Sequence, residues 1–543
     1  MLMKKFTLAV SMLCMTALSS FADSKFGSWT LNGEETKLEN YTFWGASYNT
    51  LKPGIANQTV VTSDGAQVVT GYSLSMMTGM QQAIITKTGA NGWTRSIASA
   101  EITAAVADNA GGIYVAGVFG SSLTIGDKSL TGYKDSENNK CASFIAHYDK
   151  DGNLQAANSI VPSLNKEIAE KYEYYGQGAN SVYAQVNQLL TDGTNTYAVV
   201  AFTDILSTAD GSKTNVSGNY YYDYYGYMFG GSTKSYTVAK LDDNLSISDF
   251  VFTVKGNDYS DPTNYGCDAY STVATIADSH LYVATTFKGN GSANGNLIAG
   301  QNDPVKLSIK LNEGGCKASV LADVNLSDMA MNYKLYDGNY TWDSDGKGEN
   351  AFKAIYANGD NLILTGSSTG SSLFDETKTA KGSADVFVAS VKKADFSTDW
   401  TALSGVEENG EELELANAST INGDKVYVGS LTAEVANGSS YTLKAPYLYA
   451  VDTKTGEMQS VATTEYVASM AAASEAGQIY VSSFANQTTT VNLGLYNTRN
   501  ATGISGVKAE QTGDMKIYNL QGQRLSAPVK GQINIINGKK VVY

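Results

Sequence analysis

The chain has 543 residues, with 38 Lys and Arg against 53 Asp and Glu, and a formal net charge of -15 at pH 7. This charge repels phosphate backbones and anionic membranes, so nucleic acid is not an expected partner. Hydrophobic residues make up 43% of the chain, and 53 Gly stand beside only 6 Pro. That composition is typical of a folded protein that is rich in tight turns.

Residues 1–22 are predicted to be a secretory signal peptide. Lys4 and Lys5 precede an apolar stretch over residues 6–18, and Ser20-Phe21-Ala22 provides small residues where a signal peptidase cuts. No other segment of the sequence approaches the roughly 20 consecutive apolar residues of a transmembrane helix. We therefore expect a secreted protein without a membrane span.

A short pattern recurs seven times between residues 59 and 480. Each copy has a turn-forming cluster, then an apolar run that carries Tyr or Val, then Gly, Ala or Ser. The clearest copies are residues 107–117, 422–430 and 474–482. Repetition of this kind indicates a radial or stacked β architecture. We predict an all-β chain in which residues 23–496 form a β-propeller of about seven blades.

Each repeat is expected to supply three strands and a short fourth strand, which together make one blade. Six or eight blades are the alternatives, because repeats three to five are stretched. The last blade needs an additional strand, since an open sheet edge invites aggregation. Residues 26–31 or residues 41–44 are the candidates for that strand. The central parts of the repeats are residues 60–71, 113–118, 189–202, 273–287, 354–366, 416–429 and 471–481.

The second repeat carries a resemblance to a known family. Residues 109–117 read NAGGIYVAG and residues 144–154 read FIAHYDKDGNL. These segments resemble the SBBP-type seven-bladed propeller repeat. The resemblance implies architecture alone, because those propellers share no common activity.

The connections around repeats three to five are long and rich in tyrosine, of which the chain has 35. Long loops in a compact domain are usually functional or disordered, and aromatic content argues against disorder. Gathered on one face, these insertions would form an aromatic, acid-edged cup suited to a sugar or a peptide. The alternatives are a lid of tyrosines packed on one another and a patch against a partner protein. The candidate ligand-binding residues are Tyr174, Tyr175, Tyr222, Tyr224, Tyr225, Tyr227, Tyr336, Tyr340 and Trp342.

Metal and catalytic signals are weak in this sequence. His147 and His280 are the only two histidines, whereas zinc and copper sites need several closely spaced nitrogen or sulfur ligands. Residues 149–153 have potential oxygen ligands at alternating positions, as calcium-binding loops do, but they are better explained as a hairpin turn. Asp343 and Asp345 are candidate calcium ligands, with an ordinary polar loop as the alternative. We expect no other cofactor, and no nucleophile-elbow motif indicates an enzyme.

Cysteine usage indicates that burial, not a disulfide framework, stabilises the chain. After removal of residues 1–22, three cysteines remain, of which Cys267 and Cys316 are the first choice for a bridge. The glutamates of residues 407–414 form a charge run that is expected to be a solvated loop.

The repeat pattern ends at residue 496, where a polar linker over residues 497–512 precedes a small β module over residues 513–543. Residues 517–524 read IYNLQGQR and residues 537–541 read NGKKV. They resemble the C-terminal sorting domain of type IX secretion cargo. The resemblance implies contact with the secretion machinery and a place at, or release from, the cell surface of a Gram-negative bacterium. The alternative is a terminal β module of a periplasmic protein.

Three functions are consistent with these observations. The favoured one is non-catalytic binding of a glycan, a peptide or another protein at the cell surface. The second is a hydrolase or lyase that acts on polysaccharide, with its acids on the insertion face. The third is a structural or assembly platform.

Overall fold

The computed structural model describes the chain in segments. For part of the strands, among them the tyrosine-rich β19 and β20, the backbone alone is described. The described residues are 25–27, 29–38, 46–47, 50–51, 58–74, 81–133, 141–166, 182–224, 227–256, 267–289, 292–310, 317–336, 351–369, 373–376, 378, 380, 384–405, 412–436, 440–444, 446–485, 490–498, 517–519, 523–525, 533–536 and 539–542.

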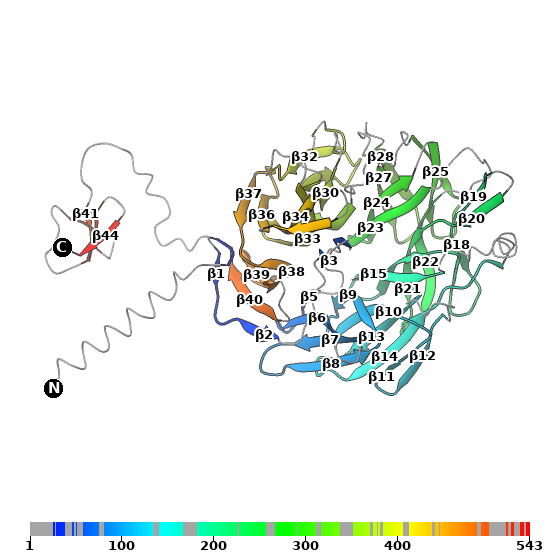
Figure 1. Ribbon diagram of the computed structural model, residues 1–543, viewed down its shortest axis with the longest axis horizontal. Helices are drawn as coiled ribbons and strands as arrows, with labels where there is room; N and C mark the ends of the chain where they lie inside the picture. Colours follow the sequence, from blue (N-terminus) through cyan, green and yellow to red (C-terminus); the bar gives the residue numbers. More distant parts are fainter. Residues whose placement is uncertain are drawn as a thin grey trace.

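Seven antiparallel sheets are arranged around a central axis, which confirms the predicted seven-bladed propeller (Figure 1). The first blade consists of β5 (Thr59–Val61), β6 (Gln67–Leu74), β7 (Gln81–Lys87) and β8 (Trp93–Ala98). The second consists of β9 (Glu101–Ala107), β10 (Ile113–Phe119), β13 (Ala142–Tyr148) and β14 (Leu154–Ile160). The third contains β15 (Ala184–Thr191), β16 (Thr196–Phe202), β21 (Ser235–Leu241) and β22 (Ile247–Lys255).

The remaining four blades follow in chain order. The fourth consists of β23 (Cys267–Ala277), β24 (His280–Gly289), β27 (Lys317–Asn325) and β28 (Met331–Tyr336). The fifth consists of β29 (Ala351–Asn358), β30 (Asn361–Ser368), β31 (Asp385–Lys392) and β32 (Thr398–Leu403). The sixth consists of β33 (Glu412–Asn422), β34 (Lys425–Ala436), β36 (Tyr447–Asp452) and β37 (Met458–Ala462). The seventh contains β38 (Tyr466–Ala472), β39 (Gln478–Phe484) and β40 (Val491–Asn497).

The seventh blade is completed by the N-terminal part of the described chain. β1 (Thr30–Leu31) pairs with β40 through Thr30 and Asn497, and β2 (Thr36–Leu38) pairs with the same strand. The expectation that residues 26–31 close the ring is therefore confirmed, while residues 41–44 lie outside the described residues. Phe26 and Trp29 are 0% and 3% exposed and pack between the sixth and seventh blades. Burying each aromatic side chain contributes about 1.5–3 kcal/mol to this closure.

The core consists of apolar layers between neighbouring blades. Alternate residues of each strand face the preceding and the following sheet, so both faces of every blade are apolar. One such layer joins the first two blades through Ile85, Ile97, Val115 and Phe144, and the other blade pairs have similar layers. The stretched repeats therefore keep the same packing as the regular ones.

Several short strands lie outside the four-stranded pattern of the blades. β25 (Ser292–Ala299) and β26 (Val305–Lys310) come from the fourth repeat but extend the sheet of the third blade, because β25 pairs with β22. The hairpins are β3 (Ala46–Ser47) with β4 (Thr50–Leu51), β11 (Ser122–Ile125) with β12 (Lys128–Thr131), β17 (Ile205–Ser207) with β18 (Thr214–Val216), and β19 (Asn219–Tyr224) with β20 (Tyr227–Ser232). β35 (Ser440–Leu443) pairs with β34.

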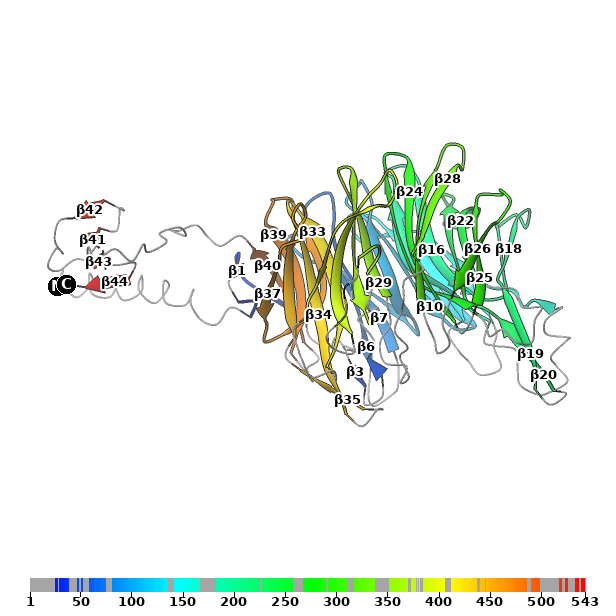
Figure 2. The same ribbon diagram turned by 90° about the horizontal axis from the view of Figure 1, so that it is seen from above.

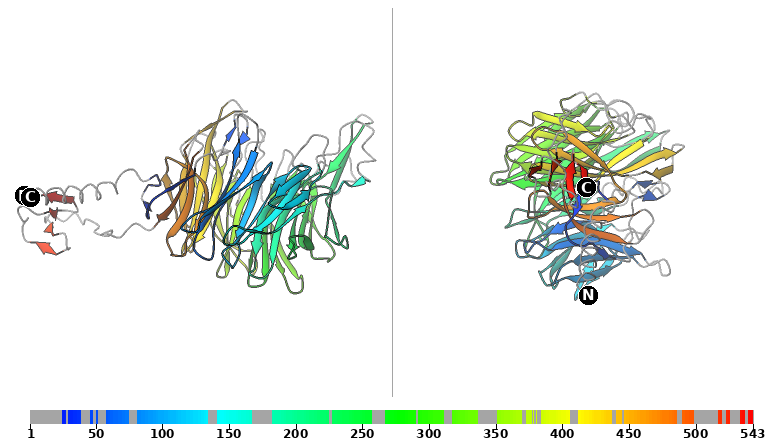
Figure 3. Two further views of the ribbon diagram at one scale, coloured as in Figure 1. Left: turned by 90° about the horizontal axis from the view of Figure 1, so that it is seen from below. Right: turned by 90° about the vertical axis from the view of Figure 1, so that its left-hand side faces the viewer.

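The two faces of the ring differ in their connections. Short hairpins join the first strand of a blade to the second and the third to the fourth, and they form one face, here called the turn face. The other connections form the insertion face, where β3, β35 and β19–β20 lie (Figures 2 and 3). β3 lies over the middle of the ring, whereas β19–β20 lies at its rim (Figures 1 and 2). The insertions thus share a face, as expected, but do not all gather over the axis.

A separate small sheet lies at the C-terminal end of the chain. It consists of β41 (Ile517–Tyr518), β42 (Arg524–Leu525), β43 (Ile533–Ile536) and β44 (Lys539–Val542), in the order β42-β41-β43-β44. The predicted terminal β module is therefore present. Among the described residues no helix is long and apolar enough to cross a membrane.

Candidate functional site

The innermost strands of the propeller carry β-bulges at one common level. In five blades the extra residue at the bulge is Thr103, Asn187, Lys353, Asn417 or Ala468. A bulge leaves its extra residue without a partner on the neighbouring strand and re-aims its side chain. These residues therefore lie on the innermost strands around the axis of the ring, where Thr103, Asn417 and Ala468 are buried and Asn187 and Lys353 are half-buried.

Two of these extra residues connect their blade to the next one. Thr103 donates a hydrogen bond from Oγ1 to the carbonyl oxygen of Val186, which precedes the bulge of the third blade. Asn417 donates from Nδ2 to the carbonyl oxygen of Val467 at 2.6 Å, again just before the next bulge. The bulges thus free carbonyl groups that accept hydrogen bonds from the preceding blade.

Lys353 occupies the same position in β29 but has no hydrogen-bond or ion-pair partner among the described residues. Its side chain is half-buried. Burial lowers the pKa of its ammonium group to about 8 because neighbouring protein displaces water. An ammonium group without a partner is costly at such a place, so it is a candidate for contact with a ligand.

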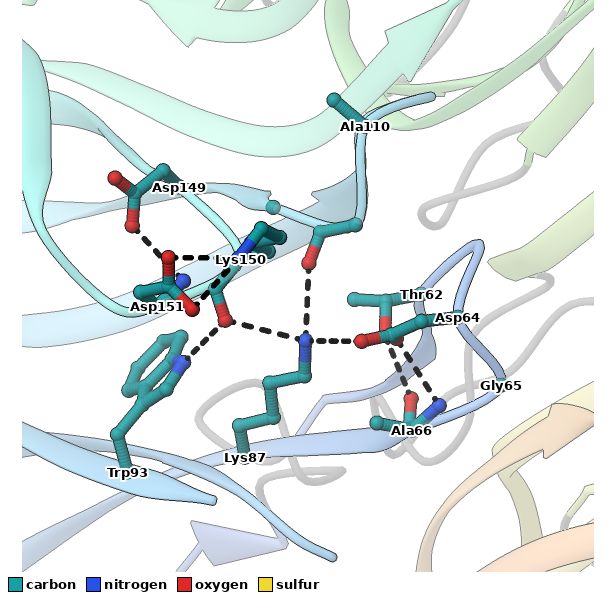
Figure 4. Close-up of polar contacts among 12 residues, drawn as sticks. Thr62, Asp64, Gly65, Ala66, Lys87, Trp93, Ala110, Asp149, Lys150 and Asp151 are labelled. Carbon is teal, nitrogen blue, oxygen red and sulfur yellow. Dashed lines mark hydrogen bonds and ion pairs between the residues drawn. The ribbon is translucent and has the colours of Figure 1, made fainter. Parts of the chain in front are cut away.

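Lys87 is a second lysine of the ring, and its buried ammonium group is surrounded by oxygen partners (Figure 4). Lys87 is 3% exposed, and its Nζ lies 2.7 Å from an Asp64 carboxylate oxygen. The same Nζ donates to the carbonyl oxygens of Gly111 at 3.2 Å and Lys150 at 3.3 Å. Lys87 therefore joins the first and second blades, and its role is structural.

Tyr270 lies one blade before Lys353 and nearer the insertion face. β23 ends on the turn face at Ala277, and its bulge lies seven residues before that end. β29 ends on the same face at Asn358, and its bulge lies five residues before that end, so the bulge of β23 is farther from the turn face. The half-buried Tyr270 ring centroid is 5.8 Å from Nζ of Lys234, which lies 5.2 Å from the Tyr236 ring. This cation–π arrangement holds an ammonium group beside a partly open aromatic surface.

Ser271 ties the Tyr270 and Lys353 positions together. The backbone N–H of Phe352 donates to Oγ of Ser271 at 3.0 Å, and that hydroxyl donates to the Phe352 carbonyl oxygen at 3.1 Å. Tyr270 precedes Ser271 and Lys353 follows Phe352, so the two positions flank one contact between innermost strands.

Tyr183 adds a further half-buried aromatic residue just before the innermost strand of the third blade. Burial raises the pKa of its hydroxyl to about 12, so the group stays neutral and can both donate and accept hydrogen bonds. We define Tyr183, Lys234, Tyr270 and Lys353 as the channel-mouth cluster. Sequence patterns named none of the four as ligand-binding residues, because only the fold shows which positions lie on the inner wall.

The tyrosines predicted from the sequence are distributed differently. Tyr222 pairs with Phe229 and Tyr224 with Tyr227 across β19–β20, so the ribbon places these residues on one of its faces. Tyr336 is 4% exposed, and its hydroxyl donates to the Phe396 carbonyl oxygen in the layer between the fourth and fifth blades. The predicted residues that lie outside the described part of the chain are Tyr174, Tyr175, Tyr225, Tyr340, Trp342, Asp343 and Asp345.

Both histidines pair with aspartates on the turn face, which the sequence alone did not indicate. His147 Nε2 lies 2.7 Å from Asp108 Oδ2, and its ring stacks on Tyr114 at 4.2 Å. His280 Nδ1 lies 2.7 Å from Asp323 Oδ1. These pairs lie at the opposite end of the ring from the insertion loops.

Residues 149–153 form the predicted turn. One Asp149 carboxylate oxygen accepts the backbone N–H groups of Asp151 at 2.9 Å and Asn153 at 2.8 Å, and the other accepts the side-chain amides of Asn153 and Gln155. Four donors leave this carboxylate little capacity for a cation.

Within the described segments, no group of three or more His, Cys, Asp or Glu residues could hold a metal ion. Cys316 lies outside those segments, so a bridge to Cys267 stays a prediction.

Comparisons with solved structures find similarities at low sequence identity, among them two propeller domains. The Myceliophteria thermophila Cps50 (Swd1) propeller domain is 10% identical, with 85% of this chain and 99% of that chain covered and a TM-score of 0.38. The propeller domain of the Trilobed protease from Pyrococcus furiosus is 9% identical, with 85% and 99% covered and a TM-score of 0.37. The Trypanosoma rangeli sialidase is 10% identical, with 86% and 59% covered and a TM-score of 0.28. No family model and no curated protein matches the chain.

Proposed function

We propose that this protein is a non-catalytic glycan-binding protein whose ligand enters the channel-mouth cluster from the insertion face. The observation that carries the proposal is the ammonium group of Lys353, which has no partner among the described residues, on an innermost strand that is joined through the Ser271–Phe352 contact to the strand of the half-buried Tyr270. Tyrosine rings stack on the apolar faces of sugars while their hydroxyl groups form hydrogen bonds. A concave, mostly preformed site with few polar groups is typical of small-ligand recognition.

Two buried acids near the insertion face, Glu414 and Glu465, accept hydrogen bonds from neighbouring side chains. Glu414 accepts hydrogen bonds from the hydroxyls of Tyr449 at 2.7 Å and Ser404 at 2.5 Å. Glu465 accepts from Ser483 at 2.6 Å and from Asn492 at 3.0 Å. Glycoside hydrolysis needs two carboxyl groups that face each other across the sugar. The engagement of these two acids favours binding over the alternative of a polysaccharide hydrolase or lyase.

We also propose that the protein acts at the cell surface of a Gram-negative bacterium. The predicted signal peptide over residues 1–22 and the resemblance of residues 513–543 to a type IX sorting domain support this location. Deletion of residues 513–543 should then leave the protein in the periplasm, which cell fractionation would detect. Unchanged surface exposure of the shortened protein would contradict the sorting role and leave ligand binding unaffected.

Binding is tested with the purified mature protein on a glycan array, followed by calorimetric titration of the strongest ligand. We expect saturable binding without product, and weaker binding by about 1–3 kcal/mol after Tyr270→Ala, the range of a lost aromatic contact. Tyr114→Ala is the matched control, because Tyr114 lies on the turn face against His147. Release of reducing ends from a bound glycan would instead establish the enzyme.

A further inference from the structure

We propose that the ligand of the channel-mouth cluster is an acidic saccharide whose carboxylate or sulfate group pairs with the Lys353 ammonium. This inference rests on the proposed glycan binding and adds the chemical class of the glycan. Lys353, on the innermost strand of the fifth blade, is then the residue that binds the anion.

The first argument compares Lys353 with Lys87. Lys87 has a carboxylate and two carbonyl oxygens around its ammonium group, as a structural cation requires. Lys353 lies at the equivalent of positions where Thr103 and Asn417 bind the next blade, but it makes no such bond. A hydroxyl or amide would stabilise the ring better there, so the lysine needs a reason other than stability.

The second argument concerns the charges on the strands that pack against β29. These strands are β23, β24, β30 and β33. Their described acidic side chains are Asp268, which is exposed, and Glu414, which is engaged by Tyr449 and Ser404. The described histidine of β24, His280, lies at the turn face and pairs with Asp323. No described acid therefore pairs with Lys353, and an incoming anion would meet an unneutralised cation.

The third argument concerns the rest of the ligand. The half-buried ring of Tyr270 flanks the same Ser271 contact as Lys353, so an anion at Lys353 would leave its attached ring near an aromatic surface. Lys234 supplies a second ammonium group 5.8 Å from the Tyr270 ring centroid. The half-buried Tyr183 adds a hydroxyl group that can donate and accept hydrogen bonds, which suits a polyhydroxylated ligand better than an apolar peptide.

Because the whole protein is negatively charged, only the lysines of the channel-mouth cluster can attract an anionic ligand. A formal net charge of -15 repels anions at long range, so attraction must come from the cluster itself. Removing a lysine elsewhere on the surface should then leave affinity unchanged. Lys128, an exposed residue of β12, provides that control.

The test compares trigalacturonate, a sulfated trigalactoside and the neutral trigalactoside by calorimetric titration of the mature protein. We expect the acidic sugars to bind at least about tenfold more tightly than the neutral one, as one charge-assisted contact allows. Lys353→Met should abolish this preference by lowering the affinity for the acidic sugars to about that for the neutral sugar, whereas Lys353→Arg should retain it. Lys128→Met should behave as the unaltered protein. Comparing the two acidic sugars shows whether the group recognised is a carboxylate or a sulfate.

A direct readout of Lys353 accompanies the titration. Reductive methylation with ¹³C-formaldehyde gives each lysine an NMR signal, and the signal absent from Lys353→Met should shift on addition of the acidic sugar. Neutral and acidic sugars that bind equally, with no shift of this signal, would overturn the inference and leave glycan binding intact. Equal losses in Lys353→Met and Lys128→Met would also overturn it. The absence of binding to any sugar would overturn both proposals.

Discussion

The ammonium group of Lys25 lies 2.9 Å from a carboxylate oxygen of Glu465, and this ion pair joins the N-terminal segment to the seventh blade. Lys25 also lies 2.9 Å from Glu35, whose other oxygen accepts a hydrogen bond from the Tyr496 hydroxyl. Residues distant in the chain are thus connected where the ring closes. The closure depends on these polar contacts as well as on strand pairing.

Lys25→Met should lower the free energy of unfolding by about 1–3 kcal/mol, because it leaves the nearly buried Glu465 with an unpaired charge. Urea denaturation followed by fluorescence measures this change. Lys37→Met is the matched control, since Lys37 is an exposed residue of the same N-terminal segment. Equal effects of the two substitutions would show that the ion pair contributes nothing specific.

The same ion pair predicts a pH dependence. Burial opposes both charges, but hydrogen bonds from Ser483 and Lys25 outweigh it and lower the pKa of Glu465, while Glu465 and Glu35 raise the pKa of Lys25. The contribution of Glu465 is therefore present above its unfolded pKa of about 4.5 and is lost as pH falls through its lower folded value. The contribution of Lys25 is lost as pH rises above about 10.5. Unfolding curves of Lys25→Met should show a smaller loss of stability at both extremes than curves of the unaltered protein.

Lys87→Met should destabilise the joint between the first two blades by about 1–3 kcal/mol, because the carbonyl oxygens of Gly111 and Lys150 and the carboxylate of Asp64 each lose one donor. Hydrogen bonds from Lys87 and Thr62 lower the pKa of Asp64 to about 2. The stability that Asp64 contributes is thus present above its unfolded pKa of about 3.8 and is lost as pH falls toward 2. Hydrogen exchange of the first and second blades measures the effect. Unchanged exchange in both blades would contradict the structural role.

Lys353→Met should raise the free energy of unfolding at neutral pH by about 1–2 kcal/mol while weakening ligand binding, because it removes a poorly solvated charge. The folded pKa of Lys353, about 8, lies below its unfolded pKa of 10.5, so the unfolded chain binds more protons between these values. This group therefore makes stability rise as pH increases from about 8 to about 10.5. Lys128→Met is the control, and a destabilised Lys353→Met would show that the lysine has a structural partner.

Gly456→Ala should destabilise the sixth blade more than Gly359→Ala destabilises the fifth. Both glycines have a positive φ, of 71° and 58°. An added Cβ at Gly456 would lie 2.6 Å from Cε3 of Trp400, whereas nothing lies within 4 Å of one at Gly359. Backbone strain of about 1 kcal/mol applies to both, and overpacking adds about 1–3 kcal/mol at Gly456 alone. Thermal unfolding of the two variants measures the difference, and equal midpoints would contradict the close approach to Trp400.

Much of the architecture could be predicted from local patterns. The repeated turn-then-apolar segments, such as residues 422–430, predicted blades because each hairpin is specified by residues adjacent in the chain. The turn at Asp149 was identified for the same reason, since its carboxylate binds the backbone of the next few residues. The need to cover an open edge predicts a closing strand within residues 26–31 or 41–44, and the structure shows the first of these.

The candidate site could not be predicted in this way. Lys353 and Tyr270 matter because bulges place them on the inner wall of neighbouring blades, and neither residue belongs to a motif. The sequence also does not show the partners of His147 and His280, because Asp108 lies in the turn after β9 and Asp323 on β27, both distant in the chain from their histidines.

Local sequence is enough to specify repeated antiparallel hairpins, because strand alternation and turn chemistry are properties of neighbouring residues. The packing of the blades against one another sets which lysine ammonium groups are neutralised and which have no partner among the described residues. Lys87 and Lys353 have the same side chain, but the oxygens that surround Lys87 come from turns of the first and second blades that only the packing of these blades brings together.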